Sequence, residues 1–251
     1  MRVRQINKEV KTKMLQKNFC KSSLAALALT AAIAYAPSGS AALVNGTFEA
    51  DEASGGDVYG ASGWNVFETV FTNATDGPGF GPVSHDAGGT QSLKMYGPFV
   101  PGGAAGAFQS VPGTAGTTYQ LDAWVMNWIG DPFGNLGILQ LNFLDSGGNA
   151  LPGGVQVTVD PFGTADVDLS VIQDGADISD WTGLSLSAVA PAGTVEVQAF
   201  LLHIQTGDPC CAGGSLFWDD VSLTAVPVPA AVWLFGSGLL GLVGVARRRK
   251  S

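Results

Sequence analysis

Residues 118–128 read T-Y-Q-L-D-A-W-V-M-N-W, and apolar and more polar side chains alternate along the segment from Thr118 to Trp128. Successive side chains of a β-strand point to opposite faces, so one face of this segment is apolar and suited to a core. The apolar set is Tyr119, Leu121, Ala123 and Val125, and the opposite set is Gln120, Asp122, Trp124, Met126 and Trp128. The segment therefore predicts a long strand with one buried face.

The same alternation recurs on both sides of this segment. In residues 138–144, Leu139, Leu141 and Phe143 alternate with Gln140 and Asn142. Gly and Pro are abundant, with 35 and 13 copies, and no helical periodicity persists for three turns between residues 43 and 226. Further strands are expected at 43–49, 63–67, 91–96, 107–111, 155–159, 184–189, 195–204 and 216–224. This pattern predicts one all-β domain over residues 43–226.

The N-terminal residues 1–42 have the organisation of a secretory signal peptide. A basic stretch precedes the apolar residues 24–34, and small residues follow up to Ala42, after which we expect cleavage. The chain is therefore expected to pass through the Sec export machinery.

The C-terminal residues 227–251 predict a membrane-spanning helix. The apolar run from Ala230 to Ala246 would measure roughly 26 Å as a helix, close to the thickness of a bilayer core. The four basic residues at 247–250 favour the cytoplasmic side, which leaves the domain outside. The alternative is a buried helix that closes a soluble domain.

This tail resembles the PEP-CTERM sorting signal of exported proteins from Gram-negative bacteria that make exopolysaccharide. The resemblance is carried by Pro227 and Pro229, the run Trp-Leu-Phe-Gly-Ser-Gly at 233–238, and the cluster Arg247, Arg248 and Arg249. Val228 stands where the name-giving motif has Glu. The resemblance implies a transient stay in the inner membrane, processing by an exosortase near the Pro motif, and delivery to the cell surface or extracellular matrix.

Residues 43–226 resemble the galactose-binding-like, jelly-roll β-sandwich of carbohydrate-binding modules. The motifs are Asn-Gly-Thr-Phe-Glu at 45–49, Ser-Leu-Lys-Met at 92–95, the strand at 119–125, Phe-Leu-Asp-Ser-Gly-Gly-Asn at 143–149 and Trp-Asp-Asp-Val-Ser-Leu at 218–223. They occur in the order that the family has and span nearly the whole domain.

The charge of the domain is extreme. Residues 43–226 hold 20 of the 21 acidic residues and one of the 12 basic residues, Lys94, which gives a net charge of about −19. Such a domain cannot neutralise phosphates, so nucleic acid is excluded as a partner. The charge is explained by solubility, by binding of divalent cations, or by both.

The adjacent Cys210 and Cys211 are the only cysteines after the signal peptide. An oxidising compartment would permit a vicinal disulfide, an intermolecular link or two free thiols. The spacing of His85 and His203 from this pair does not fit a zinc site.

Asp219 is the first candidate metal ligand. In strand 216–224, simple alternation places it on one face with Phe217, Val221 and Leu223, which should point into the sandwich. A carboxylate buried there needs a cation or hydrogen bonds. The family resemblance implies one structural calcium ion bound by Asp219 and Glu49, with Asp220 and Asp51 as further candidates. The alternative is that Asp219 accepts hydrogen bonds from loop amides without a metal.

A glycan platform is the second candidate site. A flat aromatic ring beside amides and carboxylates suits a pyranose, which stacks on the ring while its hydroxyls form hydrogen bonds. The candidates are Trp124, Trp128, Asp122, Gln140 and Asn142. The alternative is that Trp124 packs under a loop such as 131–134, and Trp64, Trp181 and Trp218 are expected in the core or at strand edges.

Catalysis is the weakest interpretation. Asp174, Asp177 and Asp180 lie in a stretch rich in turn residues, and no spacing singles out the carboxylate pair of a glycosidase. We therefore expect an exported, non-catalytic surface or matrix protein with a structural or exopolysaccharide-binding role in biofilm. The alternatives are a secreted glycosidase or lyase, and a purely structural surface protein that binds no glycan.

Overall fold

The computed structural model describes residues 42–51, 57–74, 84–206 and 213–226, all within the compact unit Gly39–Val228. These residues form strands and loops with one 3-10 helix, η1 (Ile178–Asp180). None of the described segments forms a helix with the length and hydropathy of a membrane span. The expected signal peptide up to residue 41 and the sorting tail 227–251, with Pro227, Pro229 and its arginines, lie outside the described residues.

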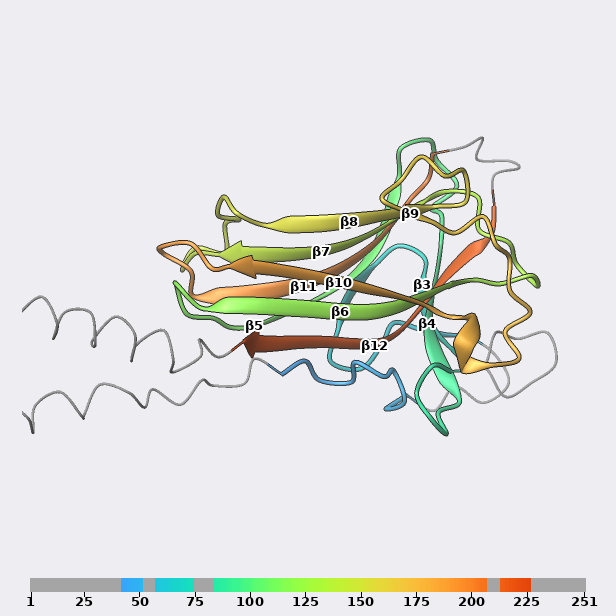
Figure 1. The fold of residues 1–251 in the computed structure, drawn as a ribbon, viewed down its shortest axis with the longest axis horizontal. Helices are drawn as coiled ribbons and strands as arrows, with labels where there is room; N and C mark the ends of the chain where they lie inside the picture. Colours follow the sequence, from blue (N-terminus) through green and yellow to red (C-terminus); the bar gives the residue numbers. More distant parts are fainter. Residues whose placement is uncertain (1–41, 52–56, 75–83, 207–212, 227–251) are drawn as a thin grey trace, which may run out of the picture. The chain divides into compact units, whose positions relative to one another are not determined.

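The strands form two six-stranded sheets (Figure 1). Neighbouring strands pair antiparallel, except for the parallel pair β8–β9. Sheet A has the order β1 (Asp57–Tyr59), β3 (Val70–Ala74), β4 (Gln91–Tyr96), β12 (Ser215–Val226), β6 (Thr118–Asn127), β10 (Thr182–Val189). Sheet B has the order β2 (Asn65–Phe67), β5 (Ala104–Pro112), β11 (Glu196–Ile204), β7 (Leu136–Leu144), β8 (Val155–Asp160), β9 (Val167–Asp168).

One hydrophobic core joins the inner faces of the two sheets. Leu121 and Val125 from β6 lie in the same buried cluster as Leu139 and Phe143 from β7. The ring of Tyr119 in sheet A contacts that of Phe143 in sheet B at a centroid distance of 6.3 Å. The alternating pattern of residues 118–128 therefore buries the face that the sequence predicts, and the all-β sandwich is confirmed.

The first predicted strand, at 43–49, is wrong. This segment forms turns, because Asn45 and Phe48 take the positive φ angles of 53° and 57°, which lie outside the region of regular β-strands. It packs against β12 instead, where the Val221 amide donates to the Gly46 carbonyl at 2.8 Å. The short strands β1, β3 and β9 were not predicted.

Candidate ligand-binding surfaces

A β-bulge in β12 separates the face of Asp219 from the face of Val221 and Leu223. Trp218 pairs with Val125 and Asp219 with Trp124, but the register shifts between Asp219 and Ser222. Asp220 has a φ of 46°, a left-handed conformation that suits a bulge. Past the bulge, Leu223 returns to the core face opposite Leu121.

The predicted common face of Phe217, Asp219, Val221 and Leu223 is therefore wrong. Phe217 belongs to a separate cluster on the outer face of sheet A, and Trp218 fills the core in its place. Asp219 lies on the outer side of sheet A opposite Trp124, on the same face as Phe217. The extra residue at the bulge then reverses the alternation, so Val221 and Leu223 point inward.

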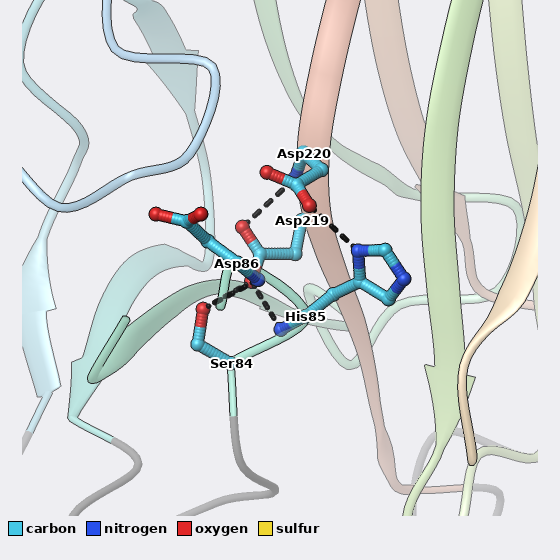
Figure 2. A network of polar contacts seen from close by, with 5 residues as sticks. All are labelled: Ser84, His85, Asp86, Asp219 and Asp220. Carbon is cyan, nitrogen blue, oxygen red and sulfur yellow. Dashed lines mark hydrogen bonds and ion pairs between the residues drawn. The ribbon is translucent and has the colours of Figure 1, made fainter. Parts of the chain in front are cut away.

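Asp219 accepts three hydrogen bonds in this position, and Figure 2 shows the network. Its Oδ2 accepts from the Ser84 hydroxyl at 2.7 Å and from the His85 amide at 2.8 Å. Its Oδ1 accepts from the Asp220 amide at 2.8 Å. The His85 ring closes the network, with Nδ1 lying 2.6 Å from Asp220 Oδ2. Loop 84–86 is thus attached to the bulge through two carboxylates, those of Asp219 and Asp220.

Burial dominates the ionisation of Asp219. Its side chain is fully buried, and loss of solvation raises its pKa from 3.8 to about 7, although hydrogen bonds from Ser84, Asp220 and His85 favour the charged form. The carboxylate is therefore protonated over much of the acidic range.

The four candidate calcium ligands all accept hydrogen bonds from protein groups. Glu49 Oε1 accepts from the amides of Thr90 and Gln91, each at 2.8 Å. Asp51 accepts from the amide and hydroxyl of Ser62, at 2.8 and 2.5 Å. Asp219 and Asp220 accept the hydrogen bonds described above, from loop 84–86 and from the Asp220 amide.

No group of three or more His, Cys, Asp or Glu side chains within the described segments is placed to hold a metal ion. Asp219 accepts hydrogen bonds from loop 84–86, as the alternative describes. The calcium site stays a prediction.

Trp128 is buried, and Trp124 is half-buried with one ring face covered by a neighbouring side chain. The His85 ring stacks on Trp124 at 3.9 Å with an interplanar angle of 17°. Trp128 packs edge-to-face on Phe217 at 5.8 Å, and its Nε1 donates to the Asp174 carbonyl at 3.0 Å. The covering group over Trp124 is His85, not loop 131–134.

The proposed glycan platform is also divided between the two sheets. Asp122 shares the outer face of sheet A with Trp124 and binds the Gln120 amide through both carboxylate oxygens at 3.0 Å. Gln140 and Asn142 lie on β7, on the outer face of sheet B. The five predicted residues therefore cannot contact one sugar ring, because the core lies between them.

Gln140 and Asn142 belong instead to a row of polar side chains across sheet B. Asn142 Nδ2 donates to the side-chain oxygens of Gln140 and Gln198, each at 3.2 Å, and Gln198 donates to Ser110 at 3.3 Å. Gln140 donates to Gln156 at 3.5 Å. We call these five residues the amide row.

Three phenylalanines continue this face. Phe200 pairs with Phe108 on one side and with Gln140 on the other. Its ring lies 5.4 Å from that of Phe108 and 6.1 Å from that of Phe67, both in edge-to-face contact. All three rings are partly exposed. This phenylalanine cluster, Phe67, Phe108 and Phe200, was missed by the sequence analysis, because its members lie on three strands distant in sequence and Phe200 stands in an apolar run between Ala199 and Leu201.

A pocket of about 350 Å³ opens on the outer side of sheet A. It is lined by Asp57, Lys94, Tyr96, Phe99 and Asp131, together with Gly97, Gly213 and Gly214. Lys94 Nζ lies 3.4 Å from Asp57 Oδ2. The one signal in the sequence was that Lys94 is the single basic residue of residues 43–226.

The remaining candidates have structural positions or lie elsewhere. Trp64, Trp181 and Trp218 are buried, as expected. Asp174 and Asp177 each accept a hydrogen bond from the backbone amide two residues later in the chain, as turn residues commonly do. Cys210 and Cys211 lie outside the described residues.

The sequence matches no protein-family model and no curated protein. Solved structures are similar to it. The Stig cyclase Fisc from Fischerella sp. TAU is 18% identical over 75% of this chain and 98% of the cyclase, with a TM-score of 0.52. An arabinose-bound α-L-arabinofuranosidase is 16% identical over 75% of this chain, with a TM-score of 0.50, and only 27% of that enzyme is covered. A family 16 carbohydrate-binding module is 20% identical over 72% of this chain and 97% of the module, with a TM-score of 0.42. At these identities the likeness to the cyclase and the arabinofuranosidase shows the fold alone.

Proposed function

We propose that residues 43–226 form a galactose-binding-like domain that binds a neutral polysaccharide on the outer face of sheet B and catalyses no reaction of it. The observation that carries this proposal is the amide row lying directly beside the phenylalanine cluster. Asn142 and Gln140 have donors and acceptors at the surface, and Phe200 offers a partly exposed ring next to them. Sugar rings need this combination, since their hydroxyls form hydrogen bonds and their CH faces stack on aromatic rings.

The composition of this face supports a neutral ligand. The amide row carries no formal charge, while the domain around it has a net charge of about −19. An anionic polymer would be repelled, and the face has no cation to offset that repulsion. The fold also forms part of an arabinofuranosidase, so it is compatible with proteins that act on carbohydrates.

The test is binding of the purified full-length chain to a panel of neutral polysaccharides by affinity electrophoresis. Asn142→Ala and Phe200→Ala should each weaken retention by about fivefold or more, because one hydrogen bond or one stacked ring contributes about 1 kcal/mol or more. Gln120→Ala removes a comparable amide from the opposite face and should leave retention unchanged. If no glycan retains the protein, a purely structural role is left. If the protein shortens a glycan, and one Asp→Asn change abolishes that cleavage, the protein is an enzyme.

We also propose that the chain is exported and reaches the cell surface or matrix after processing by an exosortase. The signal-peptide pattern of residues 1–42 and the Pro-x-Pro, apolar and arginine-rich tail at 227–251 support this proposal. Mass spectrometry of the mature termini tests it: an N-terminus at Leu43 and a C-terminus near Pro229 are expected. An intact chain that remains in the cytosol would contradict it.

A further inference from the structure

The pocket on the outer side of sheet A is a second site with a different chemistry. Two of its lining residues, Tyr96 and Phe99, are aromatic, and their ring centroids lie 5.9 Å apart. Behind them, the Tyr96 ring stacks on Phe71 at 5.3 Å with an interplanar angle of 4°. Tyr59 continues the row at 5.6 Å from Phe71. Phe99 and Tyr59 are 53% and 61% exposed, so both ends of this aromatic row are open to a ligand.

The charges around this pocket are unequal. Asp57 pairs with Lys94, whereas Asp131 has no basic partner among the described residues and accepts the Ser215 hydroxyl through Oδ2 at 2.5 Å. The pocket therefore has a net charge of −1 from two carboxylates and one ammonium group. Burial, followed by the negative charges of Asp57 and Asp131, raises the pKa of Tyr96, which agrees with a negative potential at its hydroxyl.

An aromatic wall beside an unpaired carboxylate favours a positively charged ligand. The exposed ring of Phe99 attracts cations, Lys94 Nζ already lies 6.0 Å from the Tyr96 ring centroid, and Asp131 can accept a charge-assisted hydrogen bond. The large negative charge of the domain further raises the local concentration of cations. A ligand with a flat apolar face and a protonated amine satisfies all of these features.

We propose that this pocket binds protonated amino-sugar units of a partly deacetylated polysaccharide, with Asp131 accepting from the amine and Tyr96 and Phe99 packing on the ring. The choice of a sugar over another amine rests on the proposed function, but the site is separate from the face of sheet B. The site would let one domain contact a neutral chain on one sheet and a cationic chain on the other.

The experiment compares a β-1,4-linked glucosamine hexamer with its fully N-acetylated form by titration calorimetry of the full-length chain at pH 5.5. The glucosamine hexamer should bind at least tenfold more tightly. Asp131→Asn should lower the affinity for the glucosamine hexamer about tenfold, because a charged acceptor becomes a neutral one. The Asn side chain keeps an oxygen that can accept the Ser215 hydroxyl. Phe99→Ala should weaken binding two- to fivefold at an exposed position. Glu68→Gln removes one charge from an exposed site outside the pocket and should have no comparable effect.

Several results would overturn the proposal. Equal affinity for the two hexamers would show that the amine is not recognised. Equal losses in Asp131→Asn and Glu68→Gln would assign the binding to the overall charge of the domain. Binding of hexalysine with the same affinity and the same dependence on Asp131 would show an amine site that does not recognise sugars. Asn142→Ala separates the two proposals: loss of neutral-glycan binding with glucosamine binding retained supports two sites, whereas loss of both would place the amino sugar on sheet B.

Discussion

Replacing Asp219 by Asn should change the dependence of stability on pH in a defined direction. In the folded protein the pKa of Asp219 is raised to about 7 by burial, against an ordinary value of 3.8. Between about pH 4 and pH 7 the unfolded chain has lost this proton and the folded chain retains it. The free energy of unfolding contributed by this group is therefore full below about pH 4 and is lost as the pH rises toward 7.

The expected magnitude follows from the difference of about three pH units between the two states. At 1.36 kcal/mol per unit, the wild type should lose about 4 kcal/mol relative to Asp219→Asn between pH 4 and pH 8. Asp219→Asn should also lower the free energy of unfolding by about 1–3 kcal/mol at every pH. The NH₂ group of Asn is a donor, and it would face one of the backbone amides that now donate to Asp219.

Urea unfolding of the full-length wild type and Asp219→Asn, followed by tryptophan fluorescence from pH 4 to pH 8, measures this difference. Asp122→Asn controls for the loss of one negative charge from the same face of sheet A. A stability difference between wild type and Asp219→Asn that stays constant with pH, or that moves in favour of the wild type as the pH rises, would refute the assignment of Asp219 as a buried, protonated acid.

Three further measurements test other parts of the structure. Burial lowers the pKa of His203 from 6.5 to about 4, so its contribution to stability is full above about pH 6.5 and is lost as the pH falls toward 4. Relative to His203→Gln, the wild type should lose about 3 kcal/mol over this interval, and urea unfolding that shows parallel pH profiles would contradict this. Gly46→Ala should destabilise the domain by about 1–3 kcal/mol, because the added Cβ would lie 2.0 Å from the Val221 carbonyl oxygen; Gly213→Ala, which meets nothing within 4 Å, should leave the melting temperature unchanged. Chelation with EDTA should leave the melting temperature unchanged, because the four candidate calcium carboxylates already accept protein donors; a fall of several degrees that Asp219→Asn abolishes would show that they rearrange around an ion.

The alternation of side chains was sufficient to predict most long strands. Strand β4 was predicted with its observed bounds, and the predictions for β6, β7 and β11 differ by at most two residues at either end. These strands have one face in a common core, so their side chains must alternate with a period of two. The same signal was absent from β1 and β9, because strands of three and two residues are too short to show a period.

The sequence determined that the domain is all-β and acidic, and that Asp219 is a carboxylate set among apolar residues of its strand. Composition and local periodicity are properties of the chain itself. Only the tertiary structure decided that a bulge places Asp219 on the opposite face of β12 from Val221 and Leu223, and that Trp124 and Asn142 lie on opposite sides of the core. It also decided that Asp57, Lys94 and Asp131 line one pocket. The physical reason is that alternation shows which residues share a face of one strand, whereas the sheet that a strand joins, and any reversal of its faces, depend on hydrogen bonds to strands distant in sequence.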